Sequence, residues 1–338
     1  MSIAWRLAQA GARITVLEAG RAGSEASWAG AGMLAPGGEF ETRGHWCDLA
    51  LESLRLYPGF VDELQNAASA RIDFRNCGAF QIALSDEEAE RLRSRAEQQS
   101  AIGIYSEQFH PGRIPGLREG AAGAQYYPHD AVVNPRDVVR ALVVACCRAG
   151  VTVQEHHAVR EIPEDWPFDF TVIAAGAWSG SIRLGNRSGA SSLPETTPVR
   201  GHLIAYEEDT GLCDAIIRRD STYLLRRAGN VVIAGASTEE AGFDRTIDGA
   251  IAKGLAERAG DLMPALAGRP YAAWNGFRPR SATGEPVLER VPGTMVWLAY
   301  GHYRNGILLA PVTAARIAGE IMQASSRTDS SAPAASRQ

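Results

Sequence analysis

The pattern of hydrophobic and polar positions divides the chain into helical and extended segments. Apolar residues recur every three or four positions in 46–65, the period of a helix with one buried side, whereas 78–84 alternates as a strand does. The predicted helices cover 46–65, 86–99, 134–149, 248–262 and 306–322. The predicted strands cover 12–18, 78–84, 151–153, 170–176, 271–278 and 296–300, with further antiparallel strands between 198 and 240. The pattern therefore predicts a mixed α/β protein.

The order of these segments predicts two discontinuous domains. Helix and strand alternate around glycines in the first, which is typical of a doubly wound (Rossmann-like) parallel sheet. Its predicted pieces are 1–45, 132–190 and 278–323. Residues 46–131 and 191–277 are predicted to build an antiparallel α+β domain, and 324–338, rich in Ser, Pro and Ala, a disordered tail.

Residues 12–20 read ARITVLEAG, a short strand that ends on the acidic Glu18. In a dinucleotide-binding unit such a strand is the second one, and the first leads into a G-x-G-x-x-G turn that holds the pyrophosphate. Residues 1–11 read instead as the later turns of the intervening helix. We therefore expect a sheet whose first strand is missing, through a misassigned start codon or because the chain is an inactive fragment.

Composition narrows the functional classes. The net charge is −5, so no basic surface for nucleic acid or anionic lipid stands out. Five cysteines without a C-x-x-C pair fit reduced thiols in the cytoplasm, and the seven histidines show no metal-ligand spacing. A signal peptide and an apolar run near 18 residues are both missing from the pattern. We expect a cytoplasmic protein without nucleic-acid, membrane or metal binding, and leave a homo-oligomer open.

Three segments carry a resemblance to a known family. They are LEAG…GSEASWAGAGMLAPGGE (17–39), FTVIAAGAWS (170–179) and NGFRPRS…AYGHYRNGILLAP (275–311). Together they resemble the FAD-dependent amine oxidoreductases of the D-amino-acid oxidase type, most closely the thiamine-pathway glycine oxidases. The resemblance implies that the parallel-sheet domain binds FAD and that the antiparallel domain binds the substrate.

The resemblance also implies a set of cofactor-binding residues. They are Glu18, Ala19, Ala26, Ser27, Ala31, Gly32, Met33, Val159, Gly176, His302, Tyr303, Arg304, Asn305, Gly306, Ile307 and Leu308. Physical arguments support parts of the set. A carboxylate at a strand end accepts hydrogen bonds from ribose hydroxyls, and free amides at a helix N-terminus favour an anion. Val159 reads equally well as a core valine.

The same resemblance assigns the catalytic residues Arg278, Arg304 and Tyr223. Arg278 is the implied clamp for a substrate carboxylate, because a guanidinium matches a carboxylate with two hydrogen bonds. Arg304 and Tyr223 are implied second contacts near the substrate. Of the 34 basic residues only Lys253 is a lysine, so Arg278 taken alone also reads as an ordinary surface charge.

The implied reaction is oxidative deamination of glycine or another small amine or D-amino acid. Hydride transfer to noncovalent FAD gives an imine, and water and oxygen then give an α-keto acid (glyoxylate), ammonia and hydrogen peroxide, feeding thiamine biosynthesis. The chain has no cysteine after Cys213 and no histidine in 27–32 that could tether FAD, as some relatives do. Alternatives are a D-amino-acid or sarcosine dehydrogenase with a non-oxygen acceptor, and the inactive fragment. Thr238 replaces the family's apolar methionine, which favours a larger substrate.

Overall fold

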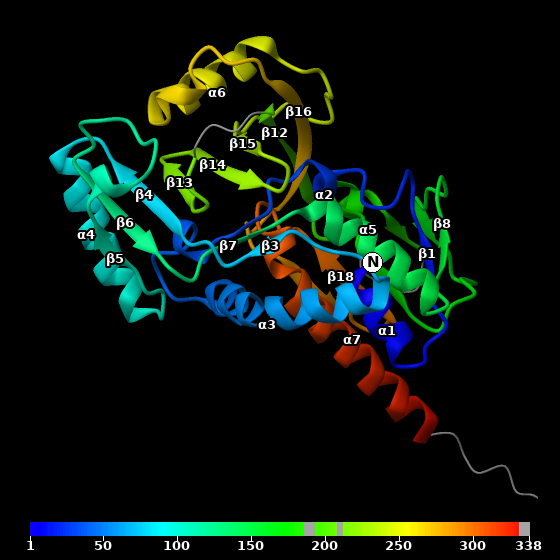
Figure 1. Ribbon diagram of the computed structural model, residues 1–338. Helices are drawn as coiled ribbons and strands as arrows, with labels where there is room; N and C mark the ends of the chain where they lie inside the picture. Colours follow the sequence, from blue (N-terminus) through cyan, green and yellow to red (C-terminus); the bar gives the residue numbers. More distant parts are fainter. Residues whose placement is uncertain (186–192, 208–211, 331–338) are drawn as a thin grey trace, which may run out of the picture.

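The fold has two regions, which lie one above the other in Figure 1. The computed structural model describes residues 1–185, 193–207 and 212–330. A large sheet and one helix over its outer face lie at the top, and parallel strand pairs surrounded by helices lie below. Because each region draws on distant parts of the sequence, the chain crosses between them several times. The predicted α/β class is confirmed. Residues 46–68 were expected in the antiparallel domain with the rest of 46–131, but they form a helix that packs in the core of the lower region.

The upper region is built on an eight-stranded sheet. Its strands, in spatial order, are β16 (Ala272–Ser281), β12 (Thr196–Glu207), β15 (Val231–Gly235), β14 (Thr222–Arg227), β13 (Ile216–Arg219), β4 (Ala79–Ala83), β6 (Gly123–Tyr127) and β5 (Glu107–Phe109). All neighbours are antiparallel except β13 and β4. The antiparallel strands expected between 198 and 240 are thus present, in one sheet with 272–281.

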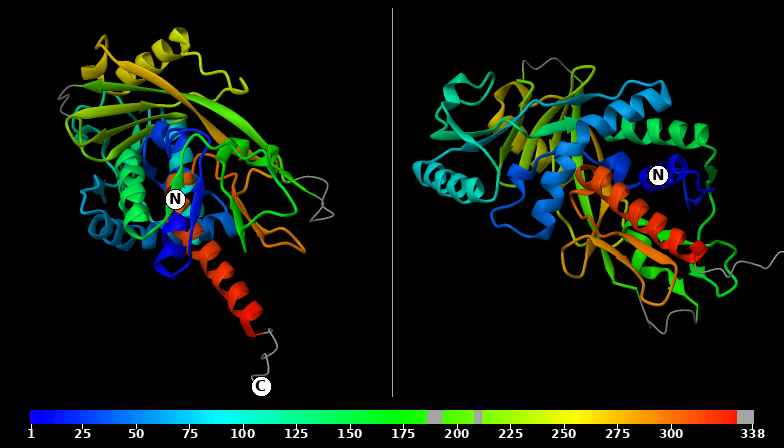
Figure 2. Two further views of the ribbon diagram at one scale, coloured as in Figure 1. Left: turned by 90° about the vertical axis from the view of Figure 1, so that its right-hand side faces the viewer. Right: turned by 90° about the horizontal axis from the view of Figure 1, so that it is seen from below.

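Two helices complete this region. Helix α6 (Gly249–Leu262) covers the outer face of the sheet, as the left view of Figure 2 shows, and buries Leu255 and Leu262 against Ile204. Asp248 caps it by accepting hydrogen bonds from two free amides of its first turn. Helix α4 (Asp86–Ala101) begins at Ser85, which caps the Glu88 amide, and packs on β4 and β6.

The lower region contains the parallel strands. Strand β1 (Thr15–Leu17) pairs with β8 (Thr152–Gln154), and β10 (Thr171–Ile173) pairs with β18 (Val296–Tyr300), which β17 (Val287–Arg290) extends antiparallel. Helices α1 (Ser2–Gln9), α3 (His45–Ala68), α5 (Pro135–Arg148) and α7 (Gly306–Ser330) surround them. Side chains at helical spacing fill the core between α3, α5 and α7, namely Leu49, Tyr57, Leu64, Leu142, Leu309 and Val312.

Short elements connect the two regions. A small antiparallel sheet has the order β2 (Met33–Leu34), β7 (Ala131–Val133), β3 (Phe74–Arg75). The remaining elements are α2 (Ala26–Ala29), β9 (Glu161–Ile162), β11 (Arg183–Leu184) and the 3-10 turns η1 (Pro36–Gly38), η2 (Pro111–Arg113), η3 (Gly176–Ser181) and η4 (Pro264–Leu266). Through β2 and η1, the glycine-rich segment after β1 runs from the lower region to the large sheet.

One expectation about the C-terminus is wrong in part. Helix α7 continues to Ser330, so 324–330 is helical and not disordered. No proline or glycine interrupts the sequence there, and adding residues to an existing helix avoids the cost of starting a new one. Residues 331–338 and the predicted domain boundary at 190/191 lie outside the described residues.

Helix α7 also has the length and mean hydropathy of a membrane-spanning helix over Gly306–Ser326. Half of this window is buried within the fold. A core helix passes the same test of length and composition, and α7 packs on α1 and α3.

Candidate functional site

A cavity of about 2130 Å³ runs between the two regions. Strands β1 and β10, the glycine-rich segment after β1 and the N-terminal end of α7 line its lower part, and β12, β14 and β16 line its upper part. Parallel strands thus meet the cavity with their carboxyl ends and the loops that follow. Ligands bind at this place in doubly wound sheets.

The cavity brings together nearly all the residues predicted from the sequence. Arg278, Arg304 and Tyr223 line it, together with every predicted cofactor residue from Glu18 to Ile307. Leu308 is the exception, because its side chain is fully buried in the core of the lower region. A contact from Leu308 to a cofactor is therefore restricted to its backbone amide.

Glu18 lies directly after β1 at one end of the cavity. Its Oε1 accepts a hydrogen bond of 2.8 Å from the Gly20 amide, and its own backbone bonds to Gln154 and His157. The carboxylate is therefore held in place by the turn that follows it. Its other oxygen has no hydrogen bond among the described residues, and it can accept one from a ligand hydroxyl.

The segment after α2 forms a second wall. Gly32 has φ of +100°, and a Cβ at this position would lie 1.8 Å from the carbonyl oxygen of Val133. Arg227, buried on β14, donates hydrogen bonds to the carbonyls of Gly30 and Ala31, at 2.6 and 2.9 Å. Burial lowers the pKa of Arg227 to about 10, so its guanidinium stays charged at neutral pH. This wall, which lies in the segment after α2, is therefore also fixed by an arginine of the large sheet.

The turn between β18 and α7 forms the third wall. Tyr303 has φ of +49°, and its amide donates to the Pro279 carbonyl at 2.9 Å. Asn305 precedes α7, and its carbonyl accepts the bond from the Leu309 amide. The amides of 306–308 therefore have no partner within the helix. The Asn305 Nδ2 is buried and has no hydrogen-bond partner among the described residues.

His302, in the same turn, is a neutral group. Its ring is buried, and its Nε2 lies 3.0 Å from the Thr313 hydroxyl on α7. Burial lowers the pKa of His302 to about 4. The ring consequently carries no charge at neutral pH and fixes the turn against α7.

Arg278 and Tyr223 face the cavity from the large sheet. Each lies over a glycine of a neighbouring strand, since a Cβ at Gly201 would lie 2.2 Å from Arg278 Nη1 and one at Gly235 would lie 2.6 Å from the Tyr223 hydroxyl. Arg278 donates from Nη1 to the Ser237 carbonyl at 3.0 Å. Its Nε and Nη2, like the Tyr223 hydroxyl, have no hydrogen-bond partner in the described part of the chain.

The surroundings of Tyr223 keep its hydroxyl protonated. Burial raises the pKa of Tyr223 above its ordinary value, and the guanidinium groups of Arg278, Arg304 and Arg227 oppose this only in part. No carboxylate pairs with Arg278 within the described ranges. The cavity therefore offers an uncompensated positive charge beside a phenolic hydroxyl.

Arg304 differs from the expectation in its pairing. Its Nη2 lies 2.8 Å from Oε1 of Glu39, in an ion pair whose arginine side chain is 47% exposed. Glu39 already neutralises this guanidinium, so Arg304 is a weaker anion site than Arg278. The two side chains connect the turn before α7 with η1 at the edge of the cavity.

The donors and acceptors in the cavity fit FAD. The Glu18 carboxylate suits ribose hydroxyls, whereas the free amides at the start of α7 and the unpartnered Asn305 Nδ2 suit electron-rich oxygens of a phosphate or flavin. Gly32 allows backbone to line the wall where a side chain would not fit. Three His, Cys, Asp or Glu side chains do not converge as a metal site anywhere in 1–185, 193–207 or 212–330.

Several residues of the site were not predicted. Glu39 was within a quoted segment, but nothing in the sequence indicated its partner Arg304. Arg227, and the buried group around Glu239 and His202, come from strands whose pairing decides what they contact. Arg200 and Glu239, for example, face each other through backbone bonds between β12 and the segment after β15.

Comparisons with known proteins extend over both regions. Residues 1–320 match the DAO family, described as FAD dependent oxidoreductase. The chain is 32% identical to the glycine oxidase of Geobacillus kaustophilus (strain HTA426), over 94% of this chain and 88% of that protein. It is 29% identical to the glycine oxidase of Bacillus subtilis (strain 168), over 95% and 89%. The crystal structure of glycine oxidase from Geobacillus kaustophilus superposes with a TM-score of 0.89 at 30% identity, covering 95% of this chain and 91% of that one.

Proposed function

The chain belongs to the DAO family of FAD-dependent oxidoreductases, and we propose that it oxidises glycine or another small amino acid. It is an FAD-dependent amine oxidoreductase. In the proposed reaction the substrate loses a hydride from its α-carbon and a proton from its nitrogen. Water then converts the imine to an α-keto acid and ammonia. Oxygen is the proposed terminal electron acceptor and hydrogen peroxide the second product.

The position of Arg278 carries this proposal. Its guanidinium lies in the cavity with Nε and Nη2 unpartnered in the described part of the chain, and no carboxylate of that part neutralises it. A planar guanidinium with two free donors fits a substrate carboxylate. The Tyr223 hydroxyl is a further donor on the same wall.

The residues of the chain bind and orient the substrate. Noncovalently bound FAD supplies the hydride acceptor, and we propose that Glu18, the 31–33 segment and the turn at 302–306 hold it. Arg278 fixes the carboxylate, so the α-carbon has one orientation, and orientation alone gives a large part of a rate acceleration. The neutral His302 and the protonated Tyr223 leave the positive charge of Arg278 uncompensated by a nearby anion.

Thr238 bears on the size of the substrate. It lines the cavity between Ser237 and Glu239, and its side chain is exposed there. A threonine occupies less space than a long apolar side chain and adds a hydroxyl. We propose that the site accepts substrates larger than glycine, such as D-alanine or sarcosine, and that the product enters thiamine biosynthesis when glycine is used.

Peroxide release tests the function directly. FAD-loaded protein should release hydrogen peroxide and amine in equal amounts with at least one of three substrates. The amine is ammonia from glycine or D-alanine and methylamine from sarcosine. If the substrate bleaches the flavin absorbance under nitrogen but no peroxide forms in air, the terminal electron acceptor is a compound other than oxygen. Flavin absorbance that no amine changes would contradict amino-acid oxidation itself.

The pH dependence gives an independent prediction. We expect kcat/KM to rise between pH 6 and 9, by up to about tenfold per pH unit, because only the neutral amine can lose a hydride. The pKa of His302 is lowered to about 4 and that of Tyr223 is raised, so neither group titrates in this range. A flat profile in steady-state assays would contradict oxidation of the neutral amine.

A further inference from the structure

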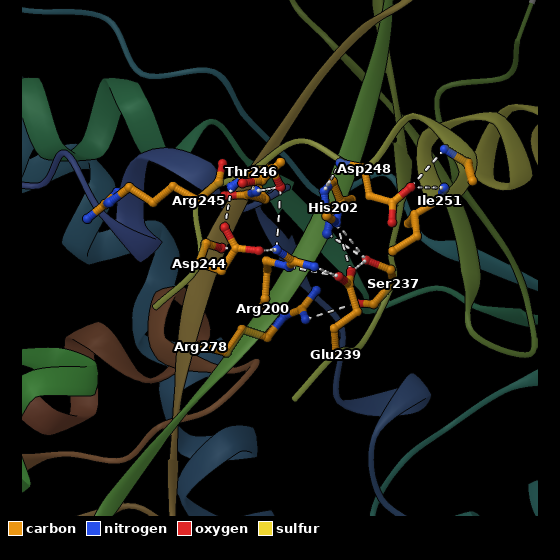
Figure 3. Close-up of polar contacts among 12 residues, drawn as sticks. Arg200, His202, Ser237, Glu239, Asp244, Arg245, Thr246, Asp248, Ile251 and Arg278 are labelled. Atoms are coloured by element: carbon orange, nitrogen blue, oxygen red, sulfur yellow. Dashed lines mark hydrogen bonds and ion pairs between the residues drawn. The ribbon is translucent and has the colours of Figure 1, made fainter. Parts of the chain in front are cut away.

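A largely buried polar cluster lies next to Arg278 (Figure 3), and its residues do not line the cavity. We define the Glu239 cluster as Arg200, His202, Ser237, Glu239 and Asp244. The Glu239 side chain is only 16% exposed, and those of Arg200 and His202 are 9% and 0% exposed. None of these five residues has a role in the proposed reaction, so the function of the cluster has to be explained separately.

The Glu239 carboxylate is the centre of this cluster. Its Oε1 accepts hydrogen bonds from His202 Nδ1 at 2.8 Å and from the Ser237 hydroxyl at 2.5 Å. Its Oε2 accepts a hydrogen bond from Arg200 Nε at 2.7 Å and lies 2.6 Å from Arg200 Nη2 in the same ion pair. Burial opposes ionisation, but these bonds keep the pKa of Glu239 below its ordinary value. Both oxygens are therefore fully used.

The groups around the Glu239 carboxylate have fixed roles as hydrogen-bond donors. His202 Nε2 accepts a hydrogen bond from the Asp248 amide at 3.1 Å, so the ring hydrogen is on Nδ1 and points to Glu239. Arg200 also pairs with Asp244 at 2.7 Å. Every group that faces the Glu239 carboxylate is a donor. A glutamine side chain at position 239 would place its NH₂ group, itself a donor, next to one of these donors.

Ser237 connects the cluster to Arg278. Its hydroxyl accepts from the His202 amide at 2.7 Å while donating to Glu239, and its carbonyl accepts from Arg278 Nη1 at 3.0 Å. The Ser237 and Glu239 side chains form hydrogen bonds within the cluster, whereas Thr238 between them lines the cavity. The cluster therefore fixes the carbonyl that holds the arginine.

We propose that Glu239 is a positioning residue, which fixes the Arg278 guanidinium for the substrate carboxylate through His202 and the Ser237 carbonyl. This inference rests on the proposed function, in which Arg278 binds that carboxylate. It implies that loss of the Glu239 charge loosens Ser237 and weakens carboxylate binding. Hydride transfer, once the substrate is bound, should change much less.

Acetate is the probe, because it contains the carboxylate and no oxidisable amine. Its dissociation constant is measured on FAD-loaded protein from the change in flavin absorbance. We expect Glu239→Gln to raise the Kd of acetate and the KM of the substrate about tenfold, with kcat within about twofold and the FAD content unchanged. The control is Glu240→Gln, since the neighbouring Glu240 is exposed and, among the residues that the structure describes, pairs only with Arg280. Its Kd should stay within about twofold.

Arg278→Lys tests whether Glu239 acts through Arg278. In this background the guanidinium held by Ser237 is gone, and Glu239→Gln should change the acetate Kd by less than about twofold further. A full additional tenfold increase would show that Glu239 acts elsewhere and would overturn the inference. So would an unchanged acetate Kd in Glu239→Gln, even with a lower melting temperature, because that result means a purely structural role.

Two further variants separate the possible failures. If Glu239→Gln does not fold, Ser237→Ala replaces it, because it removes only the hydroxyl that joins the two groups. We expect it to raise the acetate Kd about threefold, and no change would overturn the inference. Arg278→Ala tests the proposed function itself. Normal acetate binding in Arg278→Ala would refute the clamp, whereas lost binding there with normal binding in Glu239→Gln would refute only the role of Glu239.

Discussion

Arg278→Ala is expected to raise the KM of the amino-acid substrate by about 10- to 150-fold while the flavin spectrum stays that of the wild type. The loss corresponds to a charged hydrogen bond of about 1.5–3 kcal/mol. The flavin spectrum should not change, because the walls assigned to FAD are the Glu18 turn, the 31–33 segment and the turn before α7. Steady-state kinetics and the visible spectrum of the purified variant measure the two effects.

Arg280→Ala is the matched control for this substitution. Arg280 lies on the same strand, β16, two residues further on, but it pairs with Glu240 at 2.6 Å and does not line the cavity. Its removal should leave KM within about twofold. A colourless Arg278→Ala protein would show that Arg278 supports the cofactor or the fold instead of the substrate.

Gly32→Ala is expected to remove FAD from the purified protein and to lower the free energy of unfolding by more than about 3 kcal/mol. A Cβ at Gly32 would lie 1.8 Å from the Val133 carbonyl oxygen, and φ of +100° is a conformation that alanine avoids. The steric clash and the unfavourable φ angle both require the backbone of the 31–33 segment to move. Flavin absorbance per protein and denaturant unfolding measure the outcome.

Gly30→Ala is the control two residues earlier in the same segment. Its φ is −58°, and an added Cβ would lie 3.4 Å from the Ala26 carbonyl oxygen, an ordinary contact. This variant should keep its FAD. A Gly32→Ala protein with full flavin content would mean that the 31–33 segment does not form part of the cofactor site.

The sequence alone predicted the elements with the clearest periodicity. The helices at α3, α4, α5 and α6 were predicted within three residues at either end, because apolar spacing, caps and stop signals are all local. The C-terminal end of α7 was wrong. Composition favoured disorder from Ala324, but the helix that precedes it extends to Ser330.

For the site, the sequence indicated the groups but not their neighbours. The residues that line the cavity come in short segments, and a family resemblance finds such segments. The ion pair of Arg304 with Glu39 joins residues 265 positions apart, so no local pattern contains it. The same holds for Arg227, which reaches Gly30 and Ala31 across nearly 200 positions.

By itself, the sequence determined the α/β class, the family and the chemical groups offered to a cofactor and a carboxylate, because these depend on residue type and local order. Only the tertiary structure decided that Arg278 stays uncompensated while Arg304 is neutralised, and that Glu239 supports the Ser237 carbonyl. The physical reason is that charge pairing and burial depend on which strands become neighbours. Contacts between residues far apart in the chain decide that arrangement.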